Sequence, residues 1–461
     1  MIKRIKAVFR RMLGARDVQN AINQSVSVSP EMRQAITDWA NIYRNEPYWK
    51  KKDRRLLNLG KVIAKEFARL MLIECVITVD NSEEVNKVFS EMMKEIRPHL
   101  EKGLAKGGMV LKPYISGNGQ IQIDYVDAEN FFPTRYDSNG NIYGAVFISR
   151  TTFDGKCYTR IEKHEYDYKS RSERIENYAY KSASYDVLGG RTPLDSVPEW
   201  SGLTESAVIE NIDAPLFAYF RVPFANTVDD ESPLGVSVFE DAIGLLEDAD
   251  RQYNRYLWEF EGGELAIDAN TDTLITDDED GEEFSMPENK KRLFRKFPGY
   301  TSSGAPFYNA YAPSLRDESY NTGLDTILRR IEFNVSLAYG TISNIQNVDK
   351  TAEEIRYSKE RSYAIILELQ KSLQNAFDKL AYAVLVLTSI LGRDSLQKEL
   401  QITYTWDDSI VRDPQREFTE RLQMISAGIS KGWEMREWYF GETEEQAKKM
   451  CPESDLPDDE E

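Results

Sequence analysis

Apolar residues recur at helical spacing in three segments of the second half of the chain. In the first, residues 237–262, seven positions follow alternating steps of four and three residues, which places them on one face of a helix. Six of the seven are apolar, and Asp250 interrupts the row. The second segment, residues 319–340, carries a similar apolar face, and Gly340 is expected to end it. These patterns predict two helices separated by an insert, residues 263–315.

The third helical segment is unusually long. Thr351 and Glu354 form the S/T-x-x-E pattern of a capping box, and apolar residues then recur on one side as far as Leu391. At ~1.5 Å per residue this helix would span about 60 Å, several times the usual length in a globular protein. A short polar loop, residues 341–350, precedes it. The order predicted is therefore helix, insert, helix, loop and long helix.

The insert separates its charges by sign. Its first half is acidic with no basic residue, and a basic cluster follows. The acidic spacing does not match a calcium-binding loop, so we interpret this half as a solvated hairpin tip. The basic cluster is expected to pair with it, within or between subunits, and a grip on DNA is the open alternative. The residues singled out are Asp277, Asp278, Asp280, Lys290, Lys291, Arg292, Arg295 and Lys296.

The residue pattern in the first half of the chain predicts helices followed by antiparallel strands. Helical spacing extends over residues 29–104, and strand-like runs separated by Gly and Asn turn residues occupy residues 109–180. The predicted fold class is therefore α+β, with helices dominating the second half. Other expected elements are strands at 75–79, 217–223 and 400–406, a loop at 188–211, and helices at 415–427, 433–439 and 442–450.

Composition and charge narrow the functional classes. The 461 residues are 41% hydrophobic and 29% charged, which is typical of a globular protein, and no apolar run is long enough to cross a bilayer. The formal net charge is −19, whereas a protein that grips nucleic-acid phosphates is expected to be basic. Such a charge suits a channel through which DNA slides, or simply a soluble acidic surface. Residues 1–14 are basic and amphipathic but do not match a secretory signal.

The residue types that usually carry catalysis or bind metals are few and scattered. The two histidines and three cysteines are too distant in sequence for zinc spacing, and the cysteines favour a reducing compartment. His164 lies in an expected strand between Glu162 and Glu165 and is interpreted as structural. No Walker A loop, G-x-S-x-G elbow or H-E-x-x-H motif occurs. We therefore predict no catalytic residue, no metal site and no cofactor.

Four segments carry a more specific signal. They are GLAKGGMVLKPYIS (103–116), YVDAENFFPTRYDSNGNIYGAVF (125–147), SPLGVSVFEDAIGLLEDADRQYN (232–254) and TAEEIRYSKERSY (351–363). In this order, and with the helix–insert–helix–loop–helix pattern, the chain resembles the portal proteins of tailed bacteriophages. The resemblance is to the group from phages and prophages of Gram-positive bacteria, over about residues 39–450. None of the four segments is a catalytic signature.

The resemblance implies a portal fold that assembles into a ring around an axial channel. It implies the following division of the chain: N-terminal arm and α+β wing 1–235, stem helix 236–262, clip 263–315, second stem helix 316–340, tunnel loop 341–350, long wing helix and strand 351–411, crown 412–450 and acidic tail 451–461. A ring of this kind needs two different faces on each subunit, because its contacts are head-to-tail.

The resemblance also implies a structural function without catalysis. The expected role is a dodecameric channel at one capsid vertex for DNA packaging and ejection, in the virion and, during assembly, in the host cytoplasm. The expected partners are further copies of the chain, the large terminase, the head–tail adaptor, the major capsid and scaffolding proteins, and double-stranded DNA without sequence specificity. No stable membrane association is expected.

Two sets of site residues follow from the resemblance. The tunnel loop would face DNA at the channel constriction, and its polar, uncharged tip would touch phosphates weakly. Its residues are Ser343, Asn344, Ile345, Gln346, Asn347, Asp349 and Lys350. The charged residues of the insert would form the clip, where terminase and adaptor dock and where neighbouring subunits meet.

Two rival functions remain open at this stage. The first is a metal-dependent nuclease or phosphotransferase that would bind divalent metal through Asp277, Asp278 and Asp280. The second is an adaptor that binds a membrane or a partner through the basic helix of residues 1–14.

Overall fold

A computed structural model describes most of the chain. It covers residues 14–73, 75–185, 187–270, 294–297, 308–344, 352–397, 399–406 and 414–451. Contacts divide the chain into two compact units, Met1–Tyr404 and Thr405–Glu461. The mixture of helices and sheets confirms the predicted α+β class.

The N-terminal part of the first unit is helical, as predicted. Ser29 and Ser82 cap two of the helices, since their hydroxyl oxygens accept hydrogen bonds from the amides of Met32 and Val85. Pro98 lies within the last of these helices without ending it. The helices are α1 (Ala15–Ile22), α2 (Pro30–Tyr43), α3 (Leu59–Leu72) and α4 (Glu83–Ala105).

The strands after α4 form two sheets, whereas the sequence predicted one antiparallel meander. The first sheet has the order β10-β2-β3, because β10 returns from far along the chain to pair with β2. The second has the order β4-β5-β6-β7-β8, and β9 also pairs with β7. The first sheet comprises β2 (Gly108–Ile115), β3 (Ile121–Asp127) and β10 (Ala218–Arg221). The second comprises β4 (Phe131–Tyr136), β5 (Ile142–Phe153), β6 (Lys156–Asp167), β7 (Ser172–Ser182), β8 (Gly190–Thr192) and β9 (Ser206–Glu210).

Two sequence predictions in this region need correction or completion. The expected loop at residues 188–211 contains β8, β9 and two short 3-10 turns, because its polar residues add edge strands to β7. The strand expected at residues 217–223 is confirmed as β10. The strands expected at 75–79 and 400–406 are confirmed as β1 (Val76–Val79) and β14 (Ile402–Thr405), which pair with each other.

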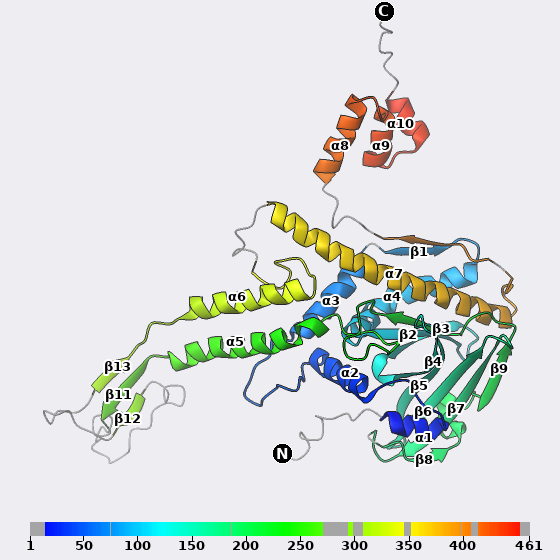
Figure 1. Cartoon of the computed structure of the whole chain (residues 1–461), viewed down its shortest axis with the longest axis horizontal. Helices are drawn as coiled ribbons and strands as arrows, with labels where there is room; N and C mark the ends of the chain where they lie inside the picture. Colours follow the sequence, from blue (N-terminus) through cyan, green and yellow to red (C-terminus); the bar gives the residue numbers. More distant parts are fainter. Residues whose placement is uncertain are drawn as a thin grey trace, which may run out of the picture. The chain divides into compact units, whose positions relative to one another are not determined.

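The long helix predicted after residue 351 is α7 (Ala352–Ile390), with 39 residues. It packs against β10, β2, α3 and α4 (Figure 1). Its predicted apolar side is fully buried at Leu369, Leu373, Phe377, Leu380 and Val384. Each such side chain contributes about 1.5–3 kcal/mol relative to an exposed position. In the part of the chain that the structure describes, no helix, α7 included, combines the length and apolarity needed to cross a bilayer.

Two antiparallel helices form a hairpin that extends from the sheets of the first unit (Figure 1). They are α5 (Ile243–Gly262) and α6 (Asp317–Asn334). A 3-10 turn occupies residues 240–242, so α5 starts later than the predicted residue 237. The helix α6 ends at Asn334 and not at Gly340, because the following segment folds back onto it.

A small sheet lies at the tip of this hairpin. It has the order β12-β11-β13, with β11 parallel to β12 and antiparallel to β13. The strands are β11 (Ala266–Asn270), β12 (Phe294–Phe297) and β13 (Tyr308–Tyr311).

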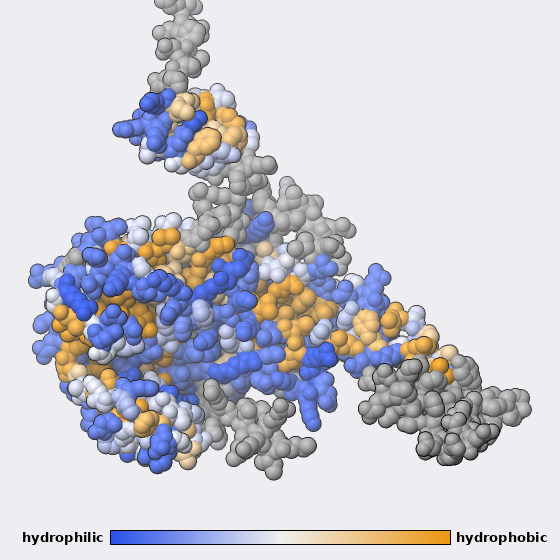
Figure 2. Space-filling model, turned by 180° about the vertical axis from the view of Figure 1, so that it is seen from behind, coloured by the Kyte–Doolittle hydropathy of each residue, from blue (hydrophilic) through white to orange (hydrophobic). Residues whose placement is uncertain are grey.

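The second unit contains three helices in the part that the structure describes. Its helices α8 (Pro414–Ser426), α9 (Gly432–Phe440) and α10 (Glu444–Met450) confirm the three helices predicted after residue 412. Among the side chains described in this unit, Ala447 alone is fully buried. Apolar side chains reach its surface (Figure 2). They include Leu422, Ile429 and Phe440.

His164 is a structural residue inside the larger sheet, as the sequence indicated. Its Nδ1 lies 2.6 Å from a carboxylate oxygen of Glu173, and its Nε2 lies 3.0 Å from Glu162. Lys112 also contacts Glu162, and Glu173 accepts a hydrogen bond from the amide of Leu216 at 2.6 Å. Burial lowers the pKa of His164, but the two carboxylates outweigh burial, and the net pKa is raised above 6.5.

Replacing His164 is expected to change how stability depends on pH. Because its pKa is higher in the folded chain than in the unfolded one, the charged imidazole stabilises the fold below about pH 6.5. This contribution is lost as pH rises through the raised value. We expect H164Q to remove on the order of 1 kcal/mol of stability at pH 6 and less at high pH, measured by urea unfolding from pH 5.5 to 9.

His99, the other histidine, gives a control of opposite sign. Burial is the main cause that lowers its pKa, so the wild type should gain stability relative to H99Q as pH rises through 6.5. A constant difference between wild type and H164Q at every pH would contradict the assignment of a charged His164.

Candidate functional site

The segment that follows α6 turns back along that helix before the predicted loop begins. The amide of Leu337 donates to the carbonyl of Glu332 at 2.9 Å, and Ser336 takes a positive φ of 58°. Gly340 has a φ of 86°, a backbone conformation that glycine adopts without steric cost. These turns bring residues 340–344 beside the last two turns of α6.

A single buried carboxylate holds this segment in place. Glu332 has no exposed surface, and its two oxygens accept hydrogen bonds from four donors. The donors are the amides of Gly340 (3.2 Å), Ile342 (2.6 Å) and Ser343 (2.9 Å), and the hydroxyl of Ser343 (2.7 Å). A buried carboxylate is costly unless such bonds replace water, so the bonds fix the segment firmly to α6.

A second acidic residue of α6 extends this anchor by one residue. The Oδ1 of Asp325 accepts a hydrogen bond from the amide of Asn344 at 2.7 Å. Its Oδ2 pairs with Arg329 at 2.7 Å, which compensates its charge. Asp325 and Glu332 are seven residues apart, so they lie on the same face of α6 two turns apart.

Arg361 of α7 ties the two sides of the predicted loop together. Its guanidinium lies 4.5 Å from the ring centre of Phe333 and 5.5 Å from that of Tyr339. It also donates to the carbonyl of Leu337 at 3.4 Å. Arg361, in the first part of α7, therefore contacts the end of α6 and the segment that follows it, so the chain before residue 345 and the chain after residue 351 are joined.

The structure describes two of the seven predicted loop residues. Ser343 is buried against Glu332, so its hydroxyl belongs to the anchor and is not exposed in this protomer. Asn344 is exposed. The others, Ile345, Gln346, Asn347, Asp349 and Lys350, lie outside the described residues, as does the predicted capping residue Thr351.

The charged residues predicted for the insert are only partly within the described chain. Arg295 and Lys296 lie in β12, in register with Asp268 and Ala269 of the parallel strand β11. The remaining predicted residues lie outside the described residues: Asp277, Asp278, Asp280, Lys290, Lys291 and Arg292. The basic helix predicted at the N-terminus falls outside them as far as residue 13.

Asp250, which interrupts the apolar row of α5, anchors the base of the hairpin. It accepts hydrogen bonds from Trp49 Nε1 at 2.9 Å and from the amide of Leu57 at 2.8 Å. Burial raises the pKa of Asp250, and these two donors offset part of that rise. The loop between α2 and α3 is thereby fixed to α5.

Sequence reasoning missed the acidic anchors, although a signal for them existed. Asp250 lies in the apolar row of a predicted helix, where an acid must find donors or remain in water. Asp325 and Glu332 each directly follow an apolar residue of the second predicted helix. Their partners lie in turns, and the sequence alone did not identify which turn returns to which helix.

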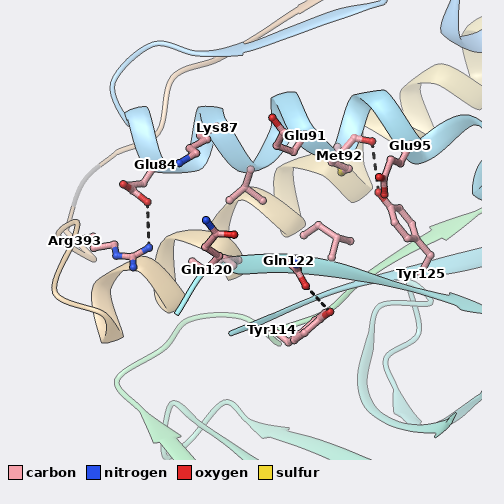
Figure 3. Close-up of a pocket in the computed structure, with 13 residues that line it drawn as sticks. Glu84, Lys87, Glu91, Met92, Glu95, Tyr114, Gln120, Gln122, Tyr125 and Arg393 are labelled. Atoms are coloured by element: carbon pink, nitrogen blue, oxygen red, sulfur yellow. Dashed lines mark hydrogen bonds and ion pairs between the residues drawn. The ribbon is translucent and has the colours of Figure 1, made fainter. Parts of the chain in front are cut away.

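A hollow of about 550 Å³ lies between α4 and β3 (Figure 3). Arg393 reaches Glu84 at 3.5 Å across one end, and Tyr114 donates to Gln122 at 2.8 Å on its floor. In the described parts of the chain, no group of three or more His, Cys, Asp or Glu side chains is arranged to hold a metal ion.

Comparison with known families gives one match over nearly the whole chain. Residues 2–455 match the model of the family described as phage portal protein, SPP1 Gp6-like. A comparison with curated proteins finds no match. The family match includes the α5–α6 hairpin, the small sheet at its tip and the anchored segment before α7.

Replacing Glu332 is expected to loosen the anchored segment. In E332Q the amide keeps one acceptor oxygen and places an NH₂ group against backbone donors, so the fold should lose about 1–3 kcal/mol. Urea unfolding measures the loss. Hydrogen exchange should show faster exchange at the amides of Ile342 and Ser343.

The matched control for this experiment is E368Q, which removes an exposed carboxylate from α7. It should change stability by less than about 0.5 kcal/mol. Equal stability of E332Q and E368Q, with unchanged amide exchange, would contradict the anchor.

Proposed function

The chain belongs to the phage portal protein family, and from this membership we propose that it is the subunit of a dodecameric channel at one capsid vertex. Double-stranded DNA passes through this channel during packaging and ejection, without sequence-specific contacts. The large terminase and later the head–tail adaptor dock on the ring, and capsid and scaffolding proteins surround it. ATP hydrolysis belongs to the terminase, and the ring subunit itself is structural. The observation that carries the proposal is the family match over residues 2–455.

The α5–α6 hairpin supports this role. A ring subunit with an axial channel needs an element that repeats side by side around an axis, and two packed antiparallel helices suit that purpose. We assign α5 and α6 to the stem, the sheet β11–β13 to the clip, α7 to the long wing helix and α8–α10 to the crown. In this assignment the clip carries the terminase and adaptor contacts, including those of Arg295 and Lys296.

The anchored segment supports the assignment of residues 341–350 to the channel constriction. Glu332 and Asp325 fix the first residues of this loop to α6, and Arg361 of α7 contacts the same side, so the described start of the loop is a fixed base. Asn344 and Gln346 give the loop polar, uncharged contacts. Weak contacts of this kind let phosphates pass, whereas strong ion pairs with phosphates would hold the DNA.

The first test of the proposal is the assembly state of the purified full-length protein. Native mass spectrometry should give a mass of about twelve times the chain mass of 53.1 kDa. Negative-stain images should show rings with an axial hole wide enough for duplex DNA. Protein that stays monomeric, both alone and when expressed with capsid and scaffolding proteins, would contradict the proposal.

Placing positive charge on the loop is expected to slow DNA passage. The variant carrying N344K and Q346K should assemble normally but package about tenfold less DNA, because rings of lysines would pair with phosphates. Packaged DNA per particle, measured by nuclease protection, reports the loss. A control variant with N344S and Q346S keeps the loop neutral and should package normally. Normal packaging by the lysine variant would refute the placement of these residues at the constriction.

A further inference from the structure

A basic patch with an exposed tryptophan lies on α5, in a chain whose net charge is −19. Arg251, Arg255 and Trp258 follow one another at steps of four and three residues, so they share one face of the helix. Arg54, from the loop before α3, completes a hollow of about 270 Å³ with them. Trp258 is 67% exposed. We call these four residues the stem patch.

The loop that carries Arg54 is fixed to α5 by its backbone. Asn254 accepts a hydrogen bond from the amide of Arg55 at 3.0 Å and donates to the carbonyl of the same residue at 2.7 Å. Asp250 accepts from the amide of Leu57 at 2.8 Å. These hydrogen bonds hold the loop against α5 and place Arg54 beside this helix.

The positive charge of the stem patch is only partly compensated. Arg251 pairs with Glu247 at 3.0 Å and with Asp248 at 3.3 Å. Within the described parts of the chain, no ion pair involves Arg54 or Arg255. Arg54 and Arg255, which have no ion pair with described residues, lie beside an exposed indole. This combination favours an anionic partner that also covers the ring, and Arg and Trp are the residues enriched at interface hot spots.

A complementary acidic patch lies at the same level of the hairpin. Asp317 and Glu318, in the first turn of α6, are exposed. Two contacts set the register of the hairpin: Arg316 pairs with Glu259 at 2.8 Å, and Gln252 donates to the carbonyl of Tyr320 at 3.3 Å. Arg255 and Trp258 therefore lie at the level of residues 317–320.

The two patches do not form an ion pair within the described protomer. In a closed ring, each copy is related to the next by rotation alone, so contacting residues lie at equal heights along the axis. Opposite charges at one level of the hairpin, which do not pair with each other within the described protomer, meet this condition.

We propose that the stem patch of one copy docks onto Asp317 and Glu318 of the next copy. This inference rests on the ring of the proposed function and names the residues that join its stems. Arg54 and Arg255 pair with the two carboxylates, and Trp258 is covered by the neighbouring helix. Duplex DNA is the less suitable partner, because a ring of arginines at one level would hold phosphates and oppose sliding.

Charge reversal tests this contact in the full-length protein. The variant R54E/R255E should lower the association constant of the ring about tenfold or more, and D317R/E318R should do the same. Combining all four substitutions should restore association, because the opposite charges meet again. Sedimentation velocity and native mass spectrometry measure the ring fraction at fixed protein concentration and at two salt concentrations.

The controls separate the contact from folding and from other partners. K169E reverses an exposed charge at the turn between β6 and β7 and should leave the ring unchanged. Thermal unfolding identifies any variant that fails to fold, and the milder pair R255Q and E318Q then replaces it. W258A should weaken the ring without changing its dependence on salt.

Three results would overturn the inference. Wild-type and reversed variants that form equally stable rings would place the stem contact elsewhere and leave the proposed function intact. Unchanged rings together with lost affinity for a short DNA duplex, measured by fluorescence anisotropy, would assign the patch to nucleic acid. A wild type that forms no ring, alone or with capsid and scaffolding proteins, would contradict the proposed function, and the contact would fall with it.

Discussion

Buried carboxylates hold irregular segments of this protein to its helices and strands through hydrogen bonds from backbone amides. Glu332 binds the segment that precedes the predicted constriction, and Asp250 binds the loop at the base of the hairpin. Glu173 binds the chain just before β10 through the amide of Leu216. Leaving such an acid without donors costs several kcal/mol, about as much as several buried methylene groups supply. Each acid therefore makes one loop conformation much more stable than the alternatives.

The strong negative charge of the chain has two separate consequences. The buried acids act locally, because each is matched by amides or by a basic side chain such as Lys112 or Arg329. The exposed acids act at long range, since their charge repels other anions. Against this background, a basic patch such as the stem patch, whose Arg54 and Arg255 have no ion pair within the described parts of the chain, is a distinct site for an acidic partner.

Local patterns predicted much of this architecture, and non-local contacts explain what they missed. The helical spacing of residues 237–262 and 352–390 and the α+β class were evident from sequence, because each depends on neighbours a few residues apart. The pairing of β10 with β2 joins segments about a hundred residues apart and leaves no local trace, so one meander was predicted where two sheets exist. The end of α6 was misplaced for the same reason, since Glu332 draws the following residues away from the helical path. The charges expected at the insert remain a prediction, because most lie outside the described residues.

The length of α7 gives the molecule a mechanical property. Its C-terminal half is clamped among strands and helices, while Arg361 near its start grips the segment that carries the loop. The C-terminal half fixes the direction of the helix, and the remaining length of roughly 30 Å acts as a lever. A tilt of about 5° over that length would move the start of α7 by roughly 3 Å, and the contacts of Arg361 with the α6 side oppose this movement.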